Sequence, residues 1–194
     1  MIPYDPRMRP QSERHMTPSD TAEMIVAAMI DGDLRPMEGH LNSGGDPDLF
    51  YRDRSLIHWA AQESDPGAVR LLLEKGASTE TNDEEGHFPL YQAAAEGSLE
   101  TVRLMVEAGA VVNRVCDSGC ALLIACAYEH MDVVRYLVEV GADPELPNKE
   151  GATARSISED YRSQELLRIL SGRRSHHPSR GHDAGNEGKV IIQG

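Results

Sequence analysis

The sequence predicts an all-α solenoid built from stacked helix-turn-helix units. Its main support is an internal repeat, because the segment 69–77 recurs about 33 residues later at 102–110 and again at 134–142. A fixed period in this range marks an array of supersecondary units. Within each copy the apolar residues follow the i, i+3, i+4 spacing of one helix face. A glycine follows each apolar stretch, as is common just past the end of a helix.

The composition narrows the classes of function. The chain has 194 residues, of which 40% are hydrophobic and only 5% aromatic, so aliphatic and small side chains must build the core. Its formal net charge of −13 disfavours nucleic acids and anionic membranes, since both attract basic proteins. We therefore expect a protein partner with a basic surface or segment, no nucleic acid and no membrane. The charge also has a simpler interpretation, which is solubility alone.

Cysteine usage and the absence of long apolar stretches indicate the compartment. Three cysteines without the spacing of a disulfide framework favour a reducing, cytoplasmic environment. No stretch approaches the roughly 18 apolar residues of a transmembrane helix. Residues 1–16 hold no apolar run long enough for a secretory signal peptide. A secreted, host-directed effector on the same scaffold remains an alternative, because some export signals lack a hydrophobic core.

Composition and periodicity divide the chain into seven segments. They are a disordered leader (1–18), a degenerate N-terminal capping repeat (19–49), three full repeats (50–82, 83–115 and 116–147), a C-terminal capping repeat (148–171) and a disordered tail (172–194). The leader contains four prolines, and the tail contains five glycines and no apolar face. Atypical terminal units are expected in a solenoid, because one side of each meets water.

Signals at the helix ends place the individual helices. The first helix is predicted to begin with an N-cap at Asp20, followed three residues later by Glu23. Pro89 fits the first position of a later helix, where its missing N–H costs nothing. The predicted apolar stripes of the second helices are Val69, Leu72 and Leu73; Val102, Met105 and Val106; and Val134, Leu137 and Val138. The glycines that end these helices are Gly76, Gly109 and Gly141.

The repeated residues resemble a known family. Residues 86–94 read Gly-His-Phe-Pro-Leu-Tyr-Gln-Ala-Ala, and residues 55–61 read Ser-Leu-Ile-His-Trp-Ala-Ala. Both are similar to the ankyrin repeat, whose unit runs G-x-T-P-L-H-x-A-A and then V-x-x-L-L-x-x-G-A. The resemblance covers residues 19–171. It implies an ankyrin-repeat solenoid with β-hairpin-like loops, and a non-enzymatic adaptor, scaffold or inhibitor that binds another protein.

The departures from the family pattern are informative. The resemblance implies that a Thr and a His tie each turn together by hydrogen bonds, yet only Thr153 keeps the Thr and only His58 keeps the His. We therefore expect a less stable array than an idealised one. The third repeat lacks one residue between Gly119 and Cys120, which should reshape its hairpin. Arg155 replaces an apolar residue in the last unit, as expected where that side faces water.

One group of residues has the composition of a metal site. Cys116, Cys120, Cys126 and His130 follow the pattern C-x3-C-x5-C-x3-H, and such ligands can hold zinc. Helical geometry argues against it, because six residues of helix place Cys120 and Cys126 on different faces. We therefore expect no metal and no cofactor. A metal- or redox-responsive Cys/His module remains the less favoured alternative.

No other pattern suggests catalysis. The run of carboxylates 83–85 is expected at a hairpin tip, exposed to water, where nothing would raise its pKa values for acid catalysis. Trp59 follows His58 on a first helix and is expected in the core. We expect no enzyme activity and no catalytic residue.

The resemblance also implies where a partner binds. In the family the hairpin tips and the exposed side of the first helices line a concave groove. The residues at the matching positions are Tyr51, Arg52, Arg54, Gln62, Glu63, Glu84, Glu85, His87, Glu96, Asp117, Ser118 and Tyr128. The central part of this set is acidic, so our hypothesis is a groove for a basic protein segment, presented by a monomer. The alternative is an acidic face that only meets water, with binding elsewhere.

Overall fold

The computed structural model describes residues 16–172. Apart from their innermost residues, the predicted leader and tail lie outside this range. The described part of the chain contains ten helices and two short β-hairpins, which confirms the all-α solenoid. The helices are α1 (Pro18–Ile30), α2 (Arg35–Asn42), α3 (Leu56–Gln62), α4 (Pro66–Glu74), α5 (Pro89–Ala95), α6 (Leu99–Glu107), α7 (Ala121–Ala127), α8 (Met131–Glu139), α9 (Ala154–Asp160) and α10 (Gln164–Ser171).

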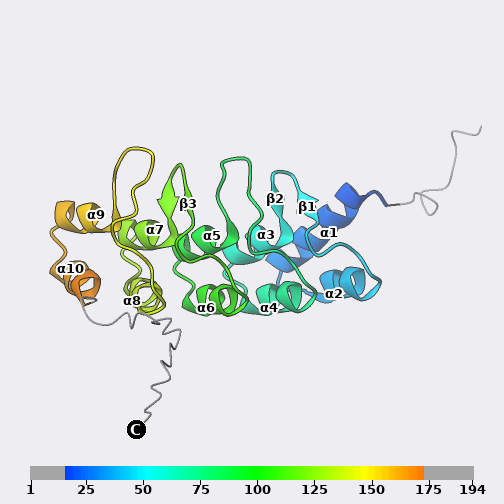
Figure 1. Ribbon diagram of the computed structural model, residues 1–194. Coiled ribbons are helices and arrows are strands. Elements are labelled where there is room, and N and C mark those ends of the chain that lie inside the picture. Colours follow the sequence, from blue (N-terminus) through cyan, green and yellow to red (C-terminus); the bar gives the residue numbers. More distant parts are fainter. Residues whose placement is uncertain (1–15, 173–194) are drawn as a thin grey trace, which may run out of the picture.

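The helices form two layers, as Figure 1 shows. The odd-numbered helices lie side by side in one layer, and the even-numbered helices form the other. The loops that enter α3, α5, α7 and α9 all project from the same side of the solenoid (Figure 1). No helix within residues 16–172 combines the length and hydrophobicity needed to span a membrane.

Small residues let the first helices approach one another closely. The paired small residues Ala60–Ala61, Ala93–Ala94 and Ala125–Cys126 all have 0% exposure. In the other layer Leu72, Met105 and Leu137 are equally buried. Leu73 and Val106, which the stripes also included, are only half-buried. The buried stripe of the second helices is thus narrower than the sequence pattern suggested.

The helix ends confirm most of the local predictions, with one correction. Pro89 is the first residue of α5, and Gly76 adopts a φ of +89°, in the left-handed region. The N-cap of α1 is Thr17 instead of Asp20. The Thr17 hydroxyl accepts from the Asp20 N–H, and the Asp20 carboxylate accepts from the Thr17 N–H, which forms a capping box. Helix α1 therefore begins inside the segment assigned to the leader, because Pro18 favours the first helical position.

Two of the projecting loops are tight β-hairpins. Strand β1 (Phe50–Tyr51) pairs antiparallel with β2 (Arg54–Ser55), and β3 (Val115–Cys116) pairs in the same way with β4 (Gly119–Cys120). In the third repeat, which lacks one residue, only two residues connect β3 to β4. This short connection agrees with the expected change in the hairpin. The first repeat has the same short loop, which the comparison of repeats did not reveal.

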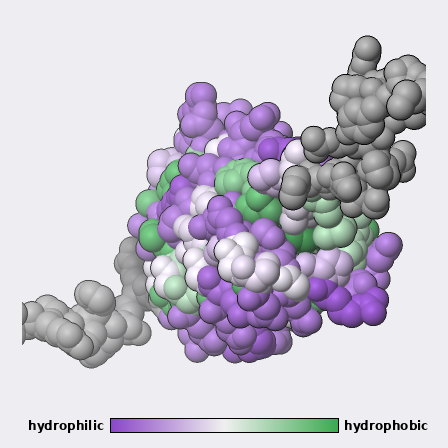
Figure 2. Space-filling view, turned by 90° about the vertical axis from the view of Figure 1, so that its right-hand side faces the viewer, coloured by the Kyte–Doolittle hydropathy of each residue, from purple (hydrophilic) through white to green (hydrophobic). Residues whose placement is uncertain are grey.

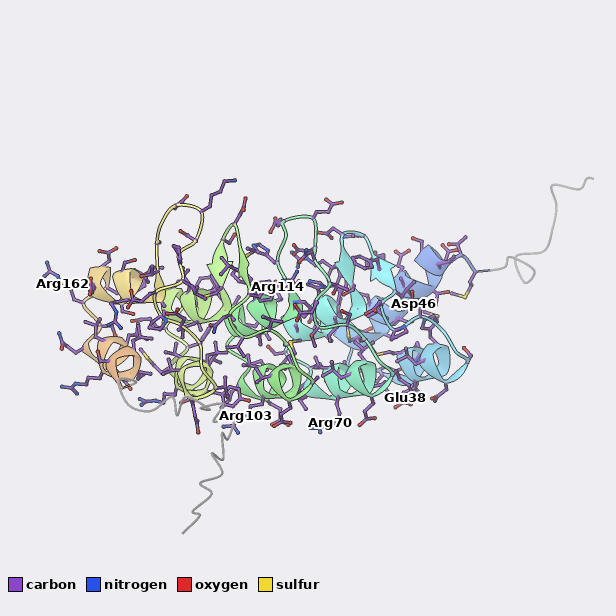
Figure 3. All side chains as sticks on the ribbon, viewed as in Figure 1. Glu38, Asp46, Arg70, Arg103, Arg114 and Arg162 are labelled. Atoms are coloured by element: carbon purple, nitrogen blue, oxygen red, sulfur yellow. The ribbon has the colours of Figure 1, made fainter. Side chains whose placement is uncertain are left out.

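Polar side chains also join consecutive units. The Arg114 guanidinium reaches back to the first-repeat segment, where it donates to the Glu80 carbonyl at 2.9 Å and to the Asn82 side chain at 2.6 Å. It also pairs with the Glu80 carboxylate at 3.0 Å. Figure 3 shows Arg114 on the loop side of the solenoid, whereas Arg70 and Arg103 belong to the other layer. These contacts fix the loops relative to one another.

The N-terminal end of the array has a mixed surface. Figure 2 looks onto this end and shows apolar patches between hydrophilic areas. Exposed apolar residues in and near α1 include Met24, Ile30 and Phe50, which are 44%, 54% and 43% exposed. The first unit therefore closes the core without presenting a fully polar outer face.

Candidate protein-interaction surface

The twelve predicted partner-binding residues lie on one side of the solenoid. All of them sit on the projecting loops or at the C-terminal ends of α3, α5 and α7. Glu63, Glu84, Glu85 and Glu96 are exposed, and Tyr128 is 60% exposed. The structure thus gathers these positions on a common surface, here called the loop face. Their role in binding stays a prediction.

An aromatic cluster forms the first part of the loop face. The Trp59 ring lies 5.9 Å from the Tyr51 ring, and its N–H donates to the Tyr51 carbonyl at 3.2 Å. Arg52 lies over the Tyr51 ring at 5.1 Å, and Arg54 lies near the Trp59 ring at 5.9 Å. Trp59 is half-buried. Trp59 was expected in the core, but part of its ring is exposed at the surface.

Asp83 departs most from the sequence-based expectation. Its side chain is fully buried, whereas the run 83–85 was expected to face water. The Oδ1 atom of Asp83 accepts backbone N–H groups of Glu85 at 3.1 Å and of His87 at 2.8 Å. The carboxylate therefore folds back into its own turn. The Asp-x-x-Gly spacing of residues 83–86 was the signal that could have revealed this turn.

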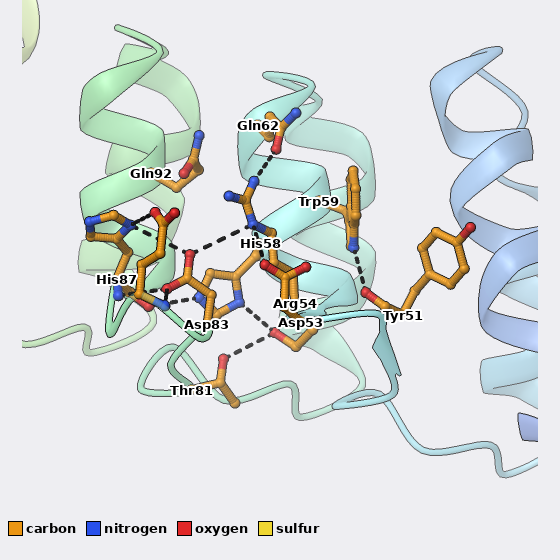
Figure 4. Close-up of polar contacts among 12 residues, drawn as sticks. Tyr51, Asp53, Arg54, His58, Trp59, Gln62, Thr81, Asp83, His87 and Gln92 are labelled. Carbon is orange, nitrogen blue, oxygen red and sulfur yellow. Dashed lines mark hydrogen bonds and ion pairs between the residues drawn. The ribbon is translucent and has the colours of Figure 1, made fainter. Parts of the chain in front are cut away.

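The second oxygen of Asp83 faces the guanidinium of Arg54 and the imidazole of His87. Its Oδ2 atom lies 3.6 Å from Nε of Arg54 and 3.5 Å from Nδ1 of His87, as Figure 4 shows. Neither Oδ2 nor the Arg54 Nε takes part in a hydrogen bond. The Arg54 side chain instead donates through Nη1 to Gln62 on α3. No sequence pattern links Arg54 with Asp83, since they belong to neighbouring repeats.

His87 links the second and third repeats. Its ring stacks on Tyr91 with a centroid distance of 4.5 Å and an interplanar angle of 4°. Its Nε2 atom lies 3.0 Å from the Ser118 hydroxyl, and its Nδ1 atom lies 3.2 Å from the Glu85 carboxylate. Three predicted surface residues are therefore in direct contact.

His58 supplies the buried tie that the family resemblance implied. Its Nδ1 atom lies 2.8 Å from the Ser55 hydroxyl, and its Nε2 atom lies 3.1 Å from the His87 carbonyl. Burial lowers the pKa of His58, because a buried imidazolium would lose its hydration. In the last unit Thr153 and Ser156 occupy the Thr and His positions of the family repeat, and they form a capping box. At the corresponding N-caps Phe88 and Cys120 form no side-chain cap.

The acidic residues of the loop face differ in their partners. Within residues 16–172 no ion pair engages Glu63, Glu84 or Glu96. Glu96 accepts a hydrogen bond from the Gln92 amide at 2.9 Å. Asp117 instead pairs at 2.8 Å with Lys149 from the next loop, a partner that the sequence analysis missed. Among the twelve residues of the loop face, the unpaired negative charge therefore lies on the first two full repeats.

The cysteines do not gather into a ligand set. Cys120 and Cys126 are buried at 2% and 0% exposure, and burial raises the pKa of Cys126 to about 12. His130 uses its Nε2 atom to donate to the Ala95 carbonyl at 2.9 Å. Among the described residues, the group whose ligand atoms all lie within 4.8 Å is Asp83, Glu85 and His87, not the Cys/His set that the sequence offered as the less favoured alternative.

Comparison with known proteins identifies the repeats. A family model for "Ankyrin repeats (3 copies)" matches residues 24–116, and the "Ankyrin repeat" model matches residues 119–149. Human ankyrin repeat and SOCS box protein 3 is 32% identical over 103 residues, which are 51% of this chain and 20% of that protein. Human SH3 and multiple ankyrin repeat domains protein 2 is 29% identical over 150 residues, which are 76% of this chain and 8% of that protein.

A third relative is similar over a larger share of its own length. The mouse B-cell lymphoma 3 protein homolog is 35% identical over 127 residues, which are 64% of this chain and 28% of that protein. The chain thus spans less than a third of each of these relatives. Since the family models cover well over half of the sequence, the chain belongs to the ankyrin repeat family.

Proposed function

We propose that the chain is a non-enzymatic adaptor, scaffold or inhibitor that binds a basic protein segment through its loop face. Its membership of the ankyrin repeat family supports a role in protein interaction. The observation that carries the choice of partner is the set of exposed carboxylates of Glu63, Glu84 and Glu96, which no internal cation neutralises within residues 16–172. Carboxylates of this kind remain available to Lys and Arg of another molecule.

The fixed geometry of the loop face favours binding. His58, His87 and Arg114 each form hydrogen bonds across neighbouring repeats, so the loops hold one another in place. A surface that is already ordered loses less conformational entropy when a partner binds. The Tyr51–Trp59 cluster and the exposed Tyr128 ring add aromatic contact area beside the acid groups.

Charge reversal tests this proposal. The partner is first isolated by affinity purification with the full chain as bait and identified by mass spectrometry. Its affinity is then compared between the unaltered chain and the combined variant Glu63→Lys, Glu84→Lys and Glu96→Lys. We expect affinity to fall by about tenfold or more, with a weaker dependence on salt concentration, since each charge pair contributes modestly.

A matched control separates local charge from total charge. Glu74, Glu107 and Glu139 are exposed residues at the C-terminal ends of α4, α6 and α8, in the other helix layer. Changing these three to Lys alters the net charge by the same amount and should leave affinity unchanged. Equal losses in both variants, or none in the loop-face variant, would remove the loop face as the binding site.

We place the protein in the cytoplasm as a monomer. The three cysteines, all within the described residues and all unpaired, fit a reducing compartment. Cell fractionation tests the location, and light scattering during size-exclusion chromatography tests the oligomeric state. Recovery of the protein from the culture medium would favour the secreted effector instead.

A further inference from the structure

A buried carboxylate oxygen without a hydrogen bond lies at the centre of the loop that enters α5. The Asp83 side chain has 0% exposure, and its Oδ2 atom accepts no hydrogen bond. An ionised oxygen taken out of water is costly unless another group compensates it. The nearest cationic atom named above, Nε of Arg54, is 3.6 Å away and also forms no hydrogen bond. Oδ2 thus has ion-pair contacts only, and no hydrogen bond has to break when it coordinates a ligand.

Two more ligand atoms lie beside this oxygen. The Nδ1 atom of His87 is 3.5 Å from Oδ2 of Asp83 and 3.2 Å from Oε2 of Glu85. The possible ligand atoms of Asp83, Glu85 and His87 all lie within 4.8 Å of one another. Tetrahedral zinc with bonds of about 2.0–2.2 Å separates neighbouring ligand atoms by about 3.3–3.6 Å. Two of the three separations are thus already close to those of a zinc site.

We propose that Asp83, Glu85 and His87 form a binding site for one zinc-class divalent metal ion. The ligand atoms are Oδ2 of Asp83, Oε2 of Glu85 and Nδ1 of His87. An imidazole favours zinc over magnesium or calcium, which prefer ligand sets made only of oxygen. Three protein ligands leave a fourth coordination position for water. The site goes beyond the proposed function, because it concerns the isolated chain and needs no protein partner.

The surrounding contacts hold two of the ligands in place. The Oδ1 atom of Asp83 accepts the backbone N–H groups of Glu85 and His87, which fixes the carboxylate. With Nδ1 bound to metal, the Nε2–H of His87 donates to the Ser118 hydroxyl, 3.0 Å away. Outer contacts of this kind orient metal ligands and raise affinity. Only the exposed Glu85 side chain must adjust when the metal binds.

The Arg54 charge opposes the metal without blocking its ligands. Its guanidinium lies near the ring of Trp59 and donates to Gln62, while Nε has no hydrogen bond to lose. The two positive charges repel each other across a largely buried space. Replacement of Arg54 by uncharged Gln should therefore tighten zinc binding by about tenfold or more.

Zinc titration of the full chain by calorimetry tests the proposal. The tail histidines His176, His177 and His182 are first replaced by Gln, so that they cannot contribute ligands. We expect one zinc ion per chain. The variants Glu85→Gln and His87→Gln should each weaken binding by about tenfold or more. Glu84→Gln is the matched control, because it removes a neighbouring exposed carboxylate that is not a ligand, and it should leave the affinity unchanged.

Cobalt(II) provides an independent readout. Cobalt bound to Asp83, Glu85 and His87 lacks the thiolate charge-transfer absorption that cysteine ligands would produce. Because Glu85 is exposed, Glu85→Gln should leave the fold intact, which circular dichroism verifies. Absence of zinc binding, an unchanged affinity in Glu85→Gln, or a thiolate absorption band would each overturn the site. The charge-reversal test of the loop face leaves all three ligands intact, so the two proposals fail separately.

Discussion

The Nε2 atom of His58 lies 3.1 Å from the carbonyl oxygen of His87, and this hydrogen bond joins the first full repeat to the second. A carbonyl can only accept, so Nε2 carries the proton and Nδ1 accepts from the Ser55 hydroxyl at 2.8 Å. The Ser55 oxygen in turn lies 3.0 Å from the Thr81 hydroxyl. Both ring nitrogens are therefore satisfied when the imidazole is neutral.

Replacement of His58 should destabilise the whole array. His58→Gln replaces the imidazole by an amide group that cannot keep both hydrogen bonds. The free energy of unfolding should therefore fall by about 1–3 kcal/mol. Ser55→Ala removes only one of the partners and should cost less. Urea denaturation followed by circular dichroism measures both changes. A variant as stable as the unaltered chain would show that the inter-repeat bond contributes nothing.

His58 should also make stability depend on pH. Burial lowers its pKa in the folded chain, so the unfolded chain, with a pKa of about 6.5, binds more protons as the pH falls. The contribution of the neutral ring is thus fully present above the unfolded pKa. It is lost as the pH falls from about 6.5 towards the lowered folded pKa. Unfolding free energies across this range should fall more steeply for the unaltered chain than for His58→Gln, and parallel curves would contradict the assignment.

The second helices should respond to truncation according to burial. Leu72 has 0% exposure, and Leu72→Ala should cost about 2–5 kcal/mol through the cavity it leaves. Leu104 is only half-buried, and Leu104→Ala should cost about 1 kcal/mol, because less apolar area is lost. Thermal midpoints compare the two, and a larger loss for Leu104→Ala would mean that the helix register is wrong.

Gly97 tests a close contact between the second and third repeats. It has a φ of +71°, and a Cβ atom there would lie 2.4 Å from Nδ1 of His130. Gly76 has a φ of +89° with nothing within 4 Å of the added Cβ. Gly76→Ala should therefore cost about 1–2 kcal/mol from backbone strain alone. Gly97→Ala should cost about 1–3 kcal/mol more, because it displaces the His130 ring.

A double variant isolates the steric part of this effect. When His130→Ala is already present, the added cost of Gly97→Ala should shrink to that of Gly76→Ala. Chemical denaturation measures the free energy of unfolding of the unaltered chain, the two single variants and the double variant. If the two substitutions were simply additive, the ring would not be the obstacle.

The cysteines should differ sharply in reactivity. Burial raises the pKa of Cys126 to about 12 and also raises the pKa of Cys120, so near pH 8 neither forms appreciable thiolate in the folded chain. Cys116 is half-buried and should react first with a disulfide reagent. We expect one rapidly reacting thiol in the native protein and three in urea. Three rapid thiols without denaturant would support the redox-responsive alternative.

Local signals were enough to predict the architecture. The 33-residue spacing, the apolar stripe around Leu72 and the left-handed Gly76 each depend on residues close in sequence. Helix periodicity and helix termination are local properties of a chain, so a sequence reveals them directly. The partner-binding candidates came instead from the family resemblance, which assigns them to equivalent positions in successive repeats.

The chemistry of that face was decided only by the tertiary structure. Asp83 was expected to face water, yet it is buried beside Arg54, which lies in the preceding repeat. His87 meets Ser118 across 31 residues, and Asp117 meets Lys149 across 32. Such contacts depend on how far side chains reach between stacked units, and the repeat pattern carries no information on that distance. The sequence by itself determined which loops form the surface, whereas the packing of one loop against the next determined which charges remain free, because only packing decides which charged groups lose water and which find a partner.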